Sequence, residues 1–267
     1  MRLIHLTDIH INATPEAETG LRACLEQVNA LAPEFIINGG DSVRDALKDD
    51  PATVDIHWEH FHRIFNEETK IPIEHLVGNH DVLAAVPAEQ AKESVKQQLS
   101  LANTYRSVIR ENWKFILLDS TRLKPDQSWY EAGLDPAQLD WLKLELQQTP
   151  PDQHICVVSH IPILAACTFL DGDNVKDGNW VVPGAWMHLD AAELVNLFAN
   201  YPNIKLCLSG HIHLHDRVQY NGITYICSGA VSGNWWKGSY QQTPPGFGLI
   251  DLNADGSFHY EYILVEN

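Results

Sequence analysis

Metal-binding residue types occur in five short motifs, and each motif directly follows an apolar run. The motifs are Asp8-Ile9-His10, Gly40-Asp41, Gly78-Asn79-His80-Asp81, His160 and Gly210-His211-Ile212-His213. The preceding runs, at residues 3–6, 35–37, 73–77, 155–158 and 204–208, have the length and composition of buried strands. Because α/β folds gather ligands at the carboxyl ends of strands, we expect all five motifs to meet at one site.

Carboxylate, imidazole and amide oxygen together are the donors of iron, manganese, zinc or cobalt sites, so the sequence leaves the metal open. Asp8 and His10 are two residues apart and can face one ion. Asp41 follows two glycines, so its loop can approach closely enough to bridge two ions. Singly, such residues more often cap turns than bind metals. Five motifs in succession favour a dinuclear site over that structural explanation.

The elements that must position these motifs alternate between strand and helix, which is typical of a largely parallel or mixed sheet covered by helices. Helices are predicted over residues 15–31, 51–68, 88–99, 136–148 and 189–199, and a strand pair over 105–109 and 113–118. Four further strands, predicted as successive antiparallel ones, cover 217–220, 224–227, 248–252 and 258–263. With no repeat or clear linker, we expect a single domain over residues 1–267.

In these motifs and their order the chain resembles the calcineurin-like metallophosphoesterase superfamily, and most closely its class III cyclic nucleotide phosphodiesterase and glycerophosphodiesterase branch. The resemblance covers residues 1–213 and implies a four-layer α/β/β/α sandwich, with the strand-rich tail in the second sheet. It implies one metal on Asp8, His10, Asp41 and His213, and another on Asp41, Asn79, His160 and His211. In that scheme a hydroxide bridging the two metals attacks phosphorus, while Asn79 and His80 contact the phosphate and His80 protonates the leaving alkoxide.

The chain departs from the family's pattern next to Asp41. Many members carry an aspartate three positions after the bridging one, where it orients the histidine of Gly-Asn-His; here that position is Arg44, and Asp45 follows it. Whether Asp45 supports His80 is left open, as is whether Arg44 binds phosphate or is an ordinary surface arginine. Purple acid phosphatases would carry tyrosine at position 44, and protein phosphatases an arginine-rich Gly-Asp segment, so both branches are disfavoured.

Two loops are predicted to contact the organic part of the substrate or a second subunit: residues 168–186 and 228–246. The first is rich in glycine, aspartate and aromatic residues, and its Asp171 to Asn174 cluster is interpreted as a turn rather than a calcium loop. The second contains Trp235 and Trp236, which could stack on a base or pack in the core. A homodimer is expected if these tryptophans are exposed.

The amino-acid composition limits the classes of molecule that the protein can bind and the compartment in which it is expected. The formal net charge of −17 argues against a nucleic-acid polymer or an anionic membrane, but not against a small anionic substrate in a metal-containing cleft. Five dispersed cysteines indicate a reducing compartment, and no apolar run is long enough for a membrane span, so a cytoplasmic location is expected.

The sequence therefore predicts a dinuclear metal-dependent hydrolase of a small phosphodiester, with a 3',5'-cyclic nucleotide such as cAMP as first candidate. Hydrolysis of a phosphomonoester or a glycerophosphodiester is the alternative. A non-catalytic scaffold is disfavoured because every expected ligand is present, and a nuclease because the chain lacks a basic and aromatic stripe.

Overall fold

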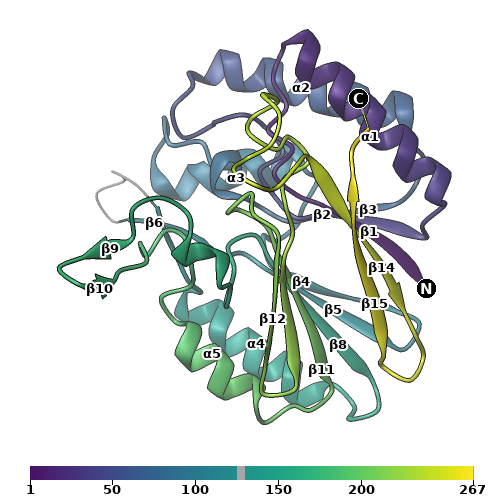
Figure 1. The fold of residues 1–267 in the computed structure, drawn as a ribbon, viewed down its shortest axis with the longest axis vertical. Coiled ribbons are helices and arrows are strands. Elements are labelled where there is room, and N and C mark those ends of the chain that lie inside the picture. The colour runs from purple at the N-terminus through teal and green to yellow at the C-terminus, as the bar shows by residue number, and fades with distance from the viewer. Residues whose placement is uncertain (125–129, 267) are drawn as a thin grey trace.

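Two stacked β-sheets form the centre of the molecule, and helices cover both outer faces (Figure 1). The computed structural model describes residues 1–124 and 130–266. Helices α1 (Pro15–Leu31), α2 (Pro51–Glu68) and α3 (Ala88–Gln98) cover the first sheet, and α4 (Pro136–Gln148) and α5 (Ala191–Phe198) cover the second. All five helices lie within two residues of their predicted bounds.

Local sequence explains where the long helices begin. Thr14 and Asp50 accept hydrogen bonds from the first free N–H groups of α1 and α2, and a proline follows each cap. Proline suits this position because its missing N–H would have no partner there. Helix α4 begins in the same way, with Asp135 accepting from the Gln138 N–H.

The first sheet has the strand order β15-β14-β1-β2-β3 and positions three of the motifs. Its strands are β1 (Arg2–Leu6), β2 (Phe35–Asn38), β3 (Ile73–His75), β14 (Gly246–Leu252) and β15 (Phe258–Leu264). The first three run parallel, so their carboxyl ends share one edge, whereas β14 lies antiparallel beside β1. The predicted strand at 73–77 ends two residues early, at His75, before the chain turns toward Gly78.

The second sheet has the order β12-β13-β11-β8-β5-β4 and positions the other two motifs. Its strands are β4 (Arg106–Arg110), β5 (Trp113–Leu118), β8 (His154–Ser159), β11 (Ile204–Ser209), β12 (Asp216–Tyr220) and β13 (Ile223–Cys227). The four inner strands are parallel, and both edge strands are antiparallel to their neighbours.

Alternating side chains within the strands define the four layers. Leu3, Phe35 and Ile37 of the first sheet pack against residues of the second such as Leu117 and Val158, while Ile4, Leu6 and Ile36 face α1 and α2. On the far side, alternate residues of β5 and β8 pack against α4 and α5. The α/β/β/α sandwich implied by the resemblance is thereby confirmed.

The prediction for the tail was wrong in one respect, because its four strands do not make up the second sheet. Strands β12 and β13 join that sheet beside β11, whereas β14 and β15 return to the first sheet beside β1. Strand β14 is apolar and buried on both faces, so it fits beside a central strand. The second sheet is instead built mainly from the middle of the chain.

Two small hairpins were not predicted. One joins β6 (Thr121–Leu123) to β7 (Tyr130–Ala132), and the other joins β9 (Val175–Lys176) to β10 (Asn179–Trp180) within loop 168–186. The second hairpin projects from the body of the molecule (Figure 1). Within the described residues, no helix is both long and apolar enough to cross a membrane.

Candidate metal centre

The five motifs converge between the two sheets. Asp8, His10 and His213 offer ligand atoms within 4.8 Å of one another, and so do Asp41, His160 and His211. Asn79 adjoins the second group, since its Oδ1 lies 3.1 Å from His160 Nε2. The structure thus brings together all seven residues predicted as metal ligands, in the two predicted sets.

Asp41 stands between the two groups. Its Oδ2 lies 3.7 Å from His10 Nε2 in the first group and 3.1 Å from His160 Nε2 in the second. The side chain of Asp41 is about 1% exposed and that of His10 is fully buried. A carboxylate in this position can bind two cations at once, as the sequence prediction requires.

Backbone carbonyls fix the tautomers of the four histidines. His10, His160 and His213 each direct Nδ1 at a carbonyl oxygen, those of Arg44, Gly39 and Gly233, at 3.2, 2.9 and 2.6 Å. His211 instead directs Nε2 at the Ala185 oxygen, at 2.9 Å. A carbonyl only accepts, so each of these nitrogens donates, and the other ring nitrogen of the neutral imidazole presents a lone pair.

The remaining atoms fit a bound cation. His10 Nε2 and His213 Nε2 face each other at 3.0 Å, and two lone pairs at that distance repel unless a cation or proton lies between them. Asp8 Oδ1 and His211 Nδ1 are buried and make no hydrogen bond with any described residue. Buried polar atoms without partners are costly, and a metal ion would satisfy them.

Burial and charge set the protonation of the cluster. Burial lowers the pKa of His10 and of His211 to about 3, so both rings are neutral and able to bind a metal. At His160 burial is outweighed by the Asp41 carboxylate, which raises the pKa to about 9. The histidines around Asp41 in turn hold its pKa well below the usual value despite burial. A bound cation would offset these carboxylate charges in place of the proton on His160.

His80 lies at the edge of the centre, and Asp45 supports it. His80 Nδ1 is 2.9 Å from Asp45 Oδ1, and the backbone N–H of His80 donates to Asp41 Oδ1 at 2.7 Å. Burial lowers the pKa of His80, but the charges of Asp41 and Asp45 outweigh it and leave the pKa raised. Asp45 therefore contacts His80 directly, which is the contact that the sequence left open.

The backbone of the loop explains why residue 45, and not residue 44, reaches His80. The loop after Asp41 forms a bridge from Val43 to Ile11, and the Arg44 N–H donates to the Ile11 carbonyl. The Arg44 side chain is exposed, whereas that of Asp45 is buried against His80. Position 45, not 44, therefore faces the centre.

Asp81 is a structural residue of the site to which the sequence assigned no role. Its carboxylate accepts hydrogen bonds from four backbone N–H groups, those of Gly78, Asp41, Ser42 and Val43, at 2.8–3.3 Å. It thus joins the loops that follow β2 and β3. Gly78 is required for the same contact, because a Cβ there would overlap the backbone nitrogen of Asp41.

The backbone of the centre is strained. Asp8, His10, Asp41, His211 and His213 all have left-handed φ values, between 46° and 72°. Trp235 and Trp236 share this conformation, with φ of 53° and 66°. Such residues persist only where surrounding contacts hold them, and they cluster at functional sites.

Both tryptophans of loop 228–246 lie beside the centre. Trp235 stacks on His10 with ring centroids 3.9 Å apart, and its edge meets His80 at 5.0 Å. Trp236 donates from Nε1 to the His10 carbonyl at 3.1 Å and packs against the backbone of Gly20. Both are half-buried, so the condition attached to the predicted homodimer is not met and the dimer stays a prediction.

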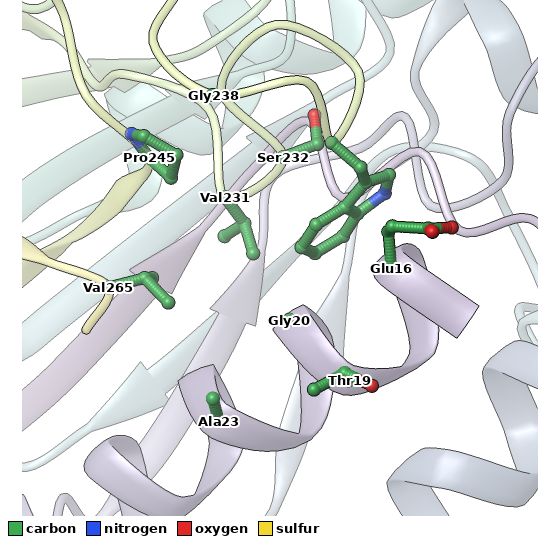
Figure 2. A pocket seen from close by; sticks show the side chains of 10 residues that line it. Glu16, Thr19, Gly20, Ala23, Val231, Ser232, Gly238, Pro245 and Val265 are labelled. Carbon is green, nitrogen blue, oxygen red and sulfur yellow. The ribbon is translucent and has the colours of Figure 1, made fainter. Parts of the chain in front are cut away.

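Two cavities adjoin these tryptophans. One, of about 450 Å³, is lined by Arg44, Trp235, Lys237 and polar residues at the start of α1. The other, of about 310 Å³, is mainly apolar and lies between α1, at Gly20 and Ala23, and the segment containing Val231 and Pro245 (Figure 2). Neither is lined by the proposed ligands, but the first lies nearer to the metal centre because Trp235, which stacks on His10, lines it.

Loop 168–186 meets the centre at two points, directly through Ala185 and indirectly through Tyr240, whose ring lies 5.7 Å from that of His213. Ala185 supplies the carbonyl that orients His211, and Asp171 accepts a hydrogen bond from Tyr240 at 2.5 Å. The Asn174 amide donates to the carbonyls of Thr168 and Asp171, which closes a turn over Asp171 to Asn174.

Comparison with known protein families identifies the family of this chain. The sequence model of the Calcineurin-like phosphoesterase family matches residues 1–215. The 3',5'-cyclic adenosine monophosphate phosphodiesterase CpdA of Escherichia coli is 26% identical over 274 aligned positions, which cover 98% of this chain and 88% of that protein. A 3',5'-cyclic-nucleotide phosphodiesterase of Nostoc sp. is also 26% identical, over 96% of this chain and 89% of its own.

Solved structures agree on the fold. A dimetal phosphatase from Danio rerio superposes with a TM-score of 0.68 at 13% identity, over 100% of this chain and 99% of its own. The purple acid phosphatase PPD1 of yellow lupin gives 0.63 at 13% identity, over 98% of this chain and 51% of its own.

Proposed function

The chain belongs to the calcineurin-like phosphoesterase family and is a dinuclear metal-dependent phosphoester hydrolase, and we propose that its substrate is a small phosphodiester. A 3',5'-cyclic nucleotide such as cAMP is the first candidate. The observation that carries the proposal is the placement of Asp41 between two histidine-containing groups, with His80 held beside them by Asp45.

We assign the ligands from the two groups. Asp8, His10 and His213 would hold one cation, and Asn79, His160 and His211 the other, with Asp41 shared. These nitrogen and oxygen donors suit manganese, iron, zinc or cobalt. When bound, two such cations supply Lewis acidity toward the phosphoryl oxygens and stabilise the charge that develops on them.

The protein's own contribution to the reaction is proton transfer and orientation. As water adds to phosphorus, the bond from phosphorus to the leaving oxygen breaks, and we assign to His80 the proton that this oxygen takes up. The water loses one proton to solvent, from which the His80 ring regains its own. The Asp45 carboxylate orients the ring and stabilises its protonated form. Asn79 and His80 are also assigned to phosphate binding.

Preference for a diester is supported by the names of the relatives, two of which are cyclic nucleotide phosphodiesterases matched over nearly their full length. The net charge of −17 fits a small substrate better than a nucleic-acid polymer. Hydrolysis of a glycerophosphodiester or a phosphomonoester remains the alternative. The cytoplasmic location stays a prediction.

The test combines metal analysis with three substrates. The purified protein is loaded with manganese, its metal content is measured, and turnover of cAMP, glycerophosphocholine and p-nitrophenyl phosphate is followed with and without chelator. We expect about two metal ions per chain and chelator-sensitive turnover of a diester. Turnover of the monoester alone would overturn the diester preference.

A matched pair of variants isolates the site. Asp41→Ala is expected to lose metal and activity together, whereas Asp140→Ala, at an exposed aspartate of α4 outside the two groups, is expected to keep both. Full metal content in Asp41→Ala would contradict the proposed sharing of this carboxylate.

A further inference from the structure

A polar cavity beside the metal centre has no role in the mechanism above. It measures about 450 Å³ and is bounded by the start of α1, by Arg44 and by the two tryptophans. Its lining residues are Asn12, Thr14, Glu16, Arg44, Trp235, Trp236 and Lys237. We propose that this cavity binds a second anionic group of the substrate, a phosphate or carboxylate carried by the organic part of the phosphodiester.

Two cations of the cavity are available to a ligand. Within residues 1–124 and 130–266, Arg44 and Lys237 make no ion pair and no side-chain hydrogen bond, and both are exposed. Most other basic side chains are engaged: Arg22 and Arg63, for example, pair with glutamates of the helices around them. In a chain with 35 acidic and 18 basic residues, two unpaired cations facing one cavity favour an anion there.

Asn12 adds a directed donor. Its side-chain oxygen accepts from the N–H and the hydroxyl of Thr14, at 3.0 and 2.6 Å. The oxygen is thereby turned toward Thr14, and the amide nitrogen makes no hydrogen bond with any described residue. With guanidinium and ammonium groups nearby, the cavity offers mainly donors, as an anionic oxygen requires.

Glu16 is the one carboxylate in the lining and opposes the two cations. It leaves the lining with one net positive charge, from two cations and one carboxylate. Because Glu16 would repel a bound anion, its removal should act in the direction opposite to removal of Arg44 or Lys237. Substitutions of the cationic and the acidic lining residues should therefore change anion binding in opposite directions.

The cavity adjoins the metal centre through two residues, Trp235 and Arg44. Trp235 lines the cavity and stacks on His10 at 3.9 Å between ring centroids. Arg44 precedes Asp45, which bonds to His80, and the Arg44 carbonyl orients His10. Trp235 and Arg44 therefore each belong to the cavity lining and contact a proposed metal ligand, and we infer that one small substrate can reach both places.

The inference rests on the proposed function and narrows its substrate class. Among small phosphodiesters, those with a further phosphate or carboxylate are expected to be preferred. A plain cyclic nucleotide would occupy the metal centre and leave Arg44 and Lys237 to solvent.

The test uses two chromogenic diesters that differ in one group: thymidine 5'-(p-nitrophenyl phosphate) and the same compound with a 3'-phosphate. The quantity measured is the ratio of their kcat/KM values on the manganese-loaded enzyme. We expect the 3'-phosphorylated diester to be preferred about tenfold, and Arg44→Gln and Lys237→Gln each to lower that ratio about three- to tenfold.

Two further variants and a salt series complete the design. Glu16→Gln is expected to raise the ratio, and Lys70→Gln, at an exposed lysine just after α2, to leave it unchanged. The ratio should fall with added salt, because exposed charges are screened. A ratio near one that Arg44→Gln, Lys237→Gln and Glu16→Gln all leave unmoved would overturn the anion site while the phosphodiesterase proposal stands. Failure of the metal-loaded enzyme to cleave these two diesters, cAMP and glycerophosphocholine would overturn the phosphodiesterase proposal itself.

Discussion

Replacing Asp45 with asparagine isolates the contact that the structure assigns to the support of His80. The two side chains meet at 2.9 Å between Asp45 Oδ1 and His80 Nδ1, and the Asp45 side chain is about 11% exposed. Asparagine has nearly the same shape but no charge, so Asp45→Asn removes the charge-assisted part of the hydrogen bond and leaves the packing in place.

The size of the effect follows from that contact. A hydrogen bond to a charged group contributes about 1.5–3 kcal/mol, and each 1.4 kcal/mol is about tenfold in rate, so the expected loss is about 10- to 150-fold. The loss should appear where His80 must protonate the leaving oxygen. An alkoxide leaving group needs that proton, whereas p-nitrophenolate leaves as a stable anion and should lose less than about threefold.

The assay compares Asp45→Asn with the parent enzyme on cAMP and on bis(p-nitrophenyl) phosphate, at saturating substrate and equal metal content. Asp49→Asn is the control, because Asp49 lies in the same loop but faces His57, at 3.9 Å, rather than His80. It should leave the ratio of the two rates unchanged.

Two results would refute the reasoning about Asp45. Equal losses on both substrates would mean that Asp45 does not act through proton donation to the leaving group. An unchanged rate on cAMP would mean that the contact with His80 has no part in catalysis.

Three further predictions concern the rest of the chain. Gly20→Ala should lower the free energy of unfolding by about 1–3 kcal/mol, because the new methyl group overlaps the Trp236 ring. The control Thr19→Ala should change the free energy of unfolding by less than about 0.5 kcal/mol. Equal urea midpoints for the two variants would contradict the overlap. Asp190 bonds to His188 and to the Leu134 N–H, which hold its pKa down despite burial. A depressed carboxyl pKa stabilises the fold above the unfolded value, near pH 4, and that contribution is lost as the pH falls through the folded pKa. Asp190→Asn should therefore lower the free energy of unfolding by about 1–2 kcal/mol at pH 7 and by less in acid. Urea titrations that show the same loss of stability at every pH would contradict this role of the Asp190 charge. All five cysteines are buried, so a thiol reagent should modify none in the native protein and five in denaturant; rapid native labelling would contradict this burial.

The ligand set was predictable because its signals are local. Each motif is a short polar segment after an apolar run, and parallel strands bring their carboxyl ends to shared edges whatever the details of packing. Helices were predictable for similar reasons, since the caps at Thr14, Asp50 and Asp135 are encoded within a few residues of each start.

Features that depend on contacts between distant segments were not predictable. Four backbone carbonyls orient the histidines, and a carbonyl is present at every residue, so no residue type marks it. The division of the tail between two sheets is likewise a matter of tertiary pairing, because β13 and β14 have similar apolar patterns but different neighbours. The role of Asp45 depended on the backbone path of the loop after Asp41, which turns residue 45, and not residue 44, toward His80.

The left-handed backbone of the centre makes its residue types unfavourable for the stability of the fold. Five of the seven proposed ligands are held in a conformation that costs an L-residue of order 1 kcal/mol, or about 5 kcal/mol together. That sum is comparable with the whole net stability of many domains, about 5–15 kcal/mol. Glycine would relieve it at every one of these positions. The stability of the fold alone therefore does not account for two aspartates and three histidines at these positions, whereas their chemistry does.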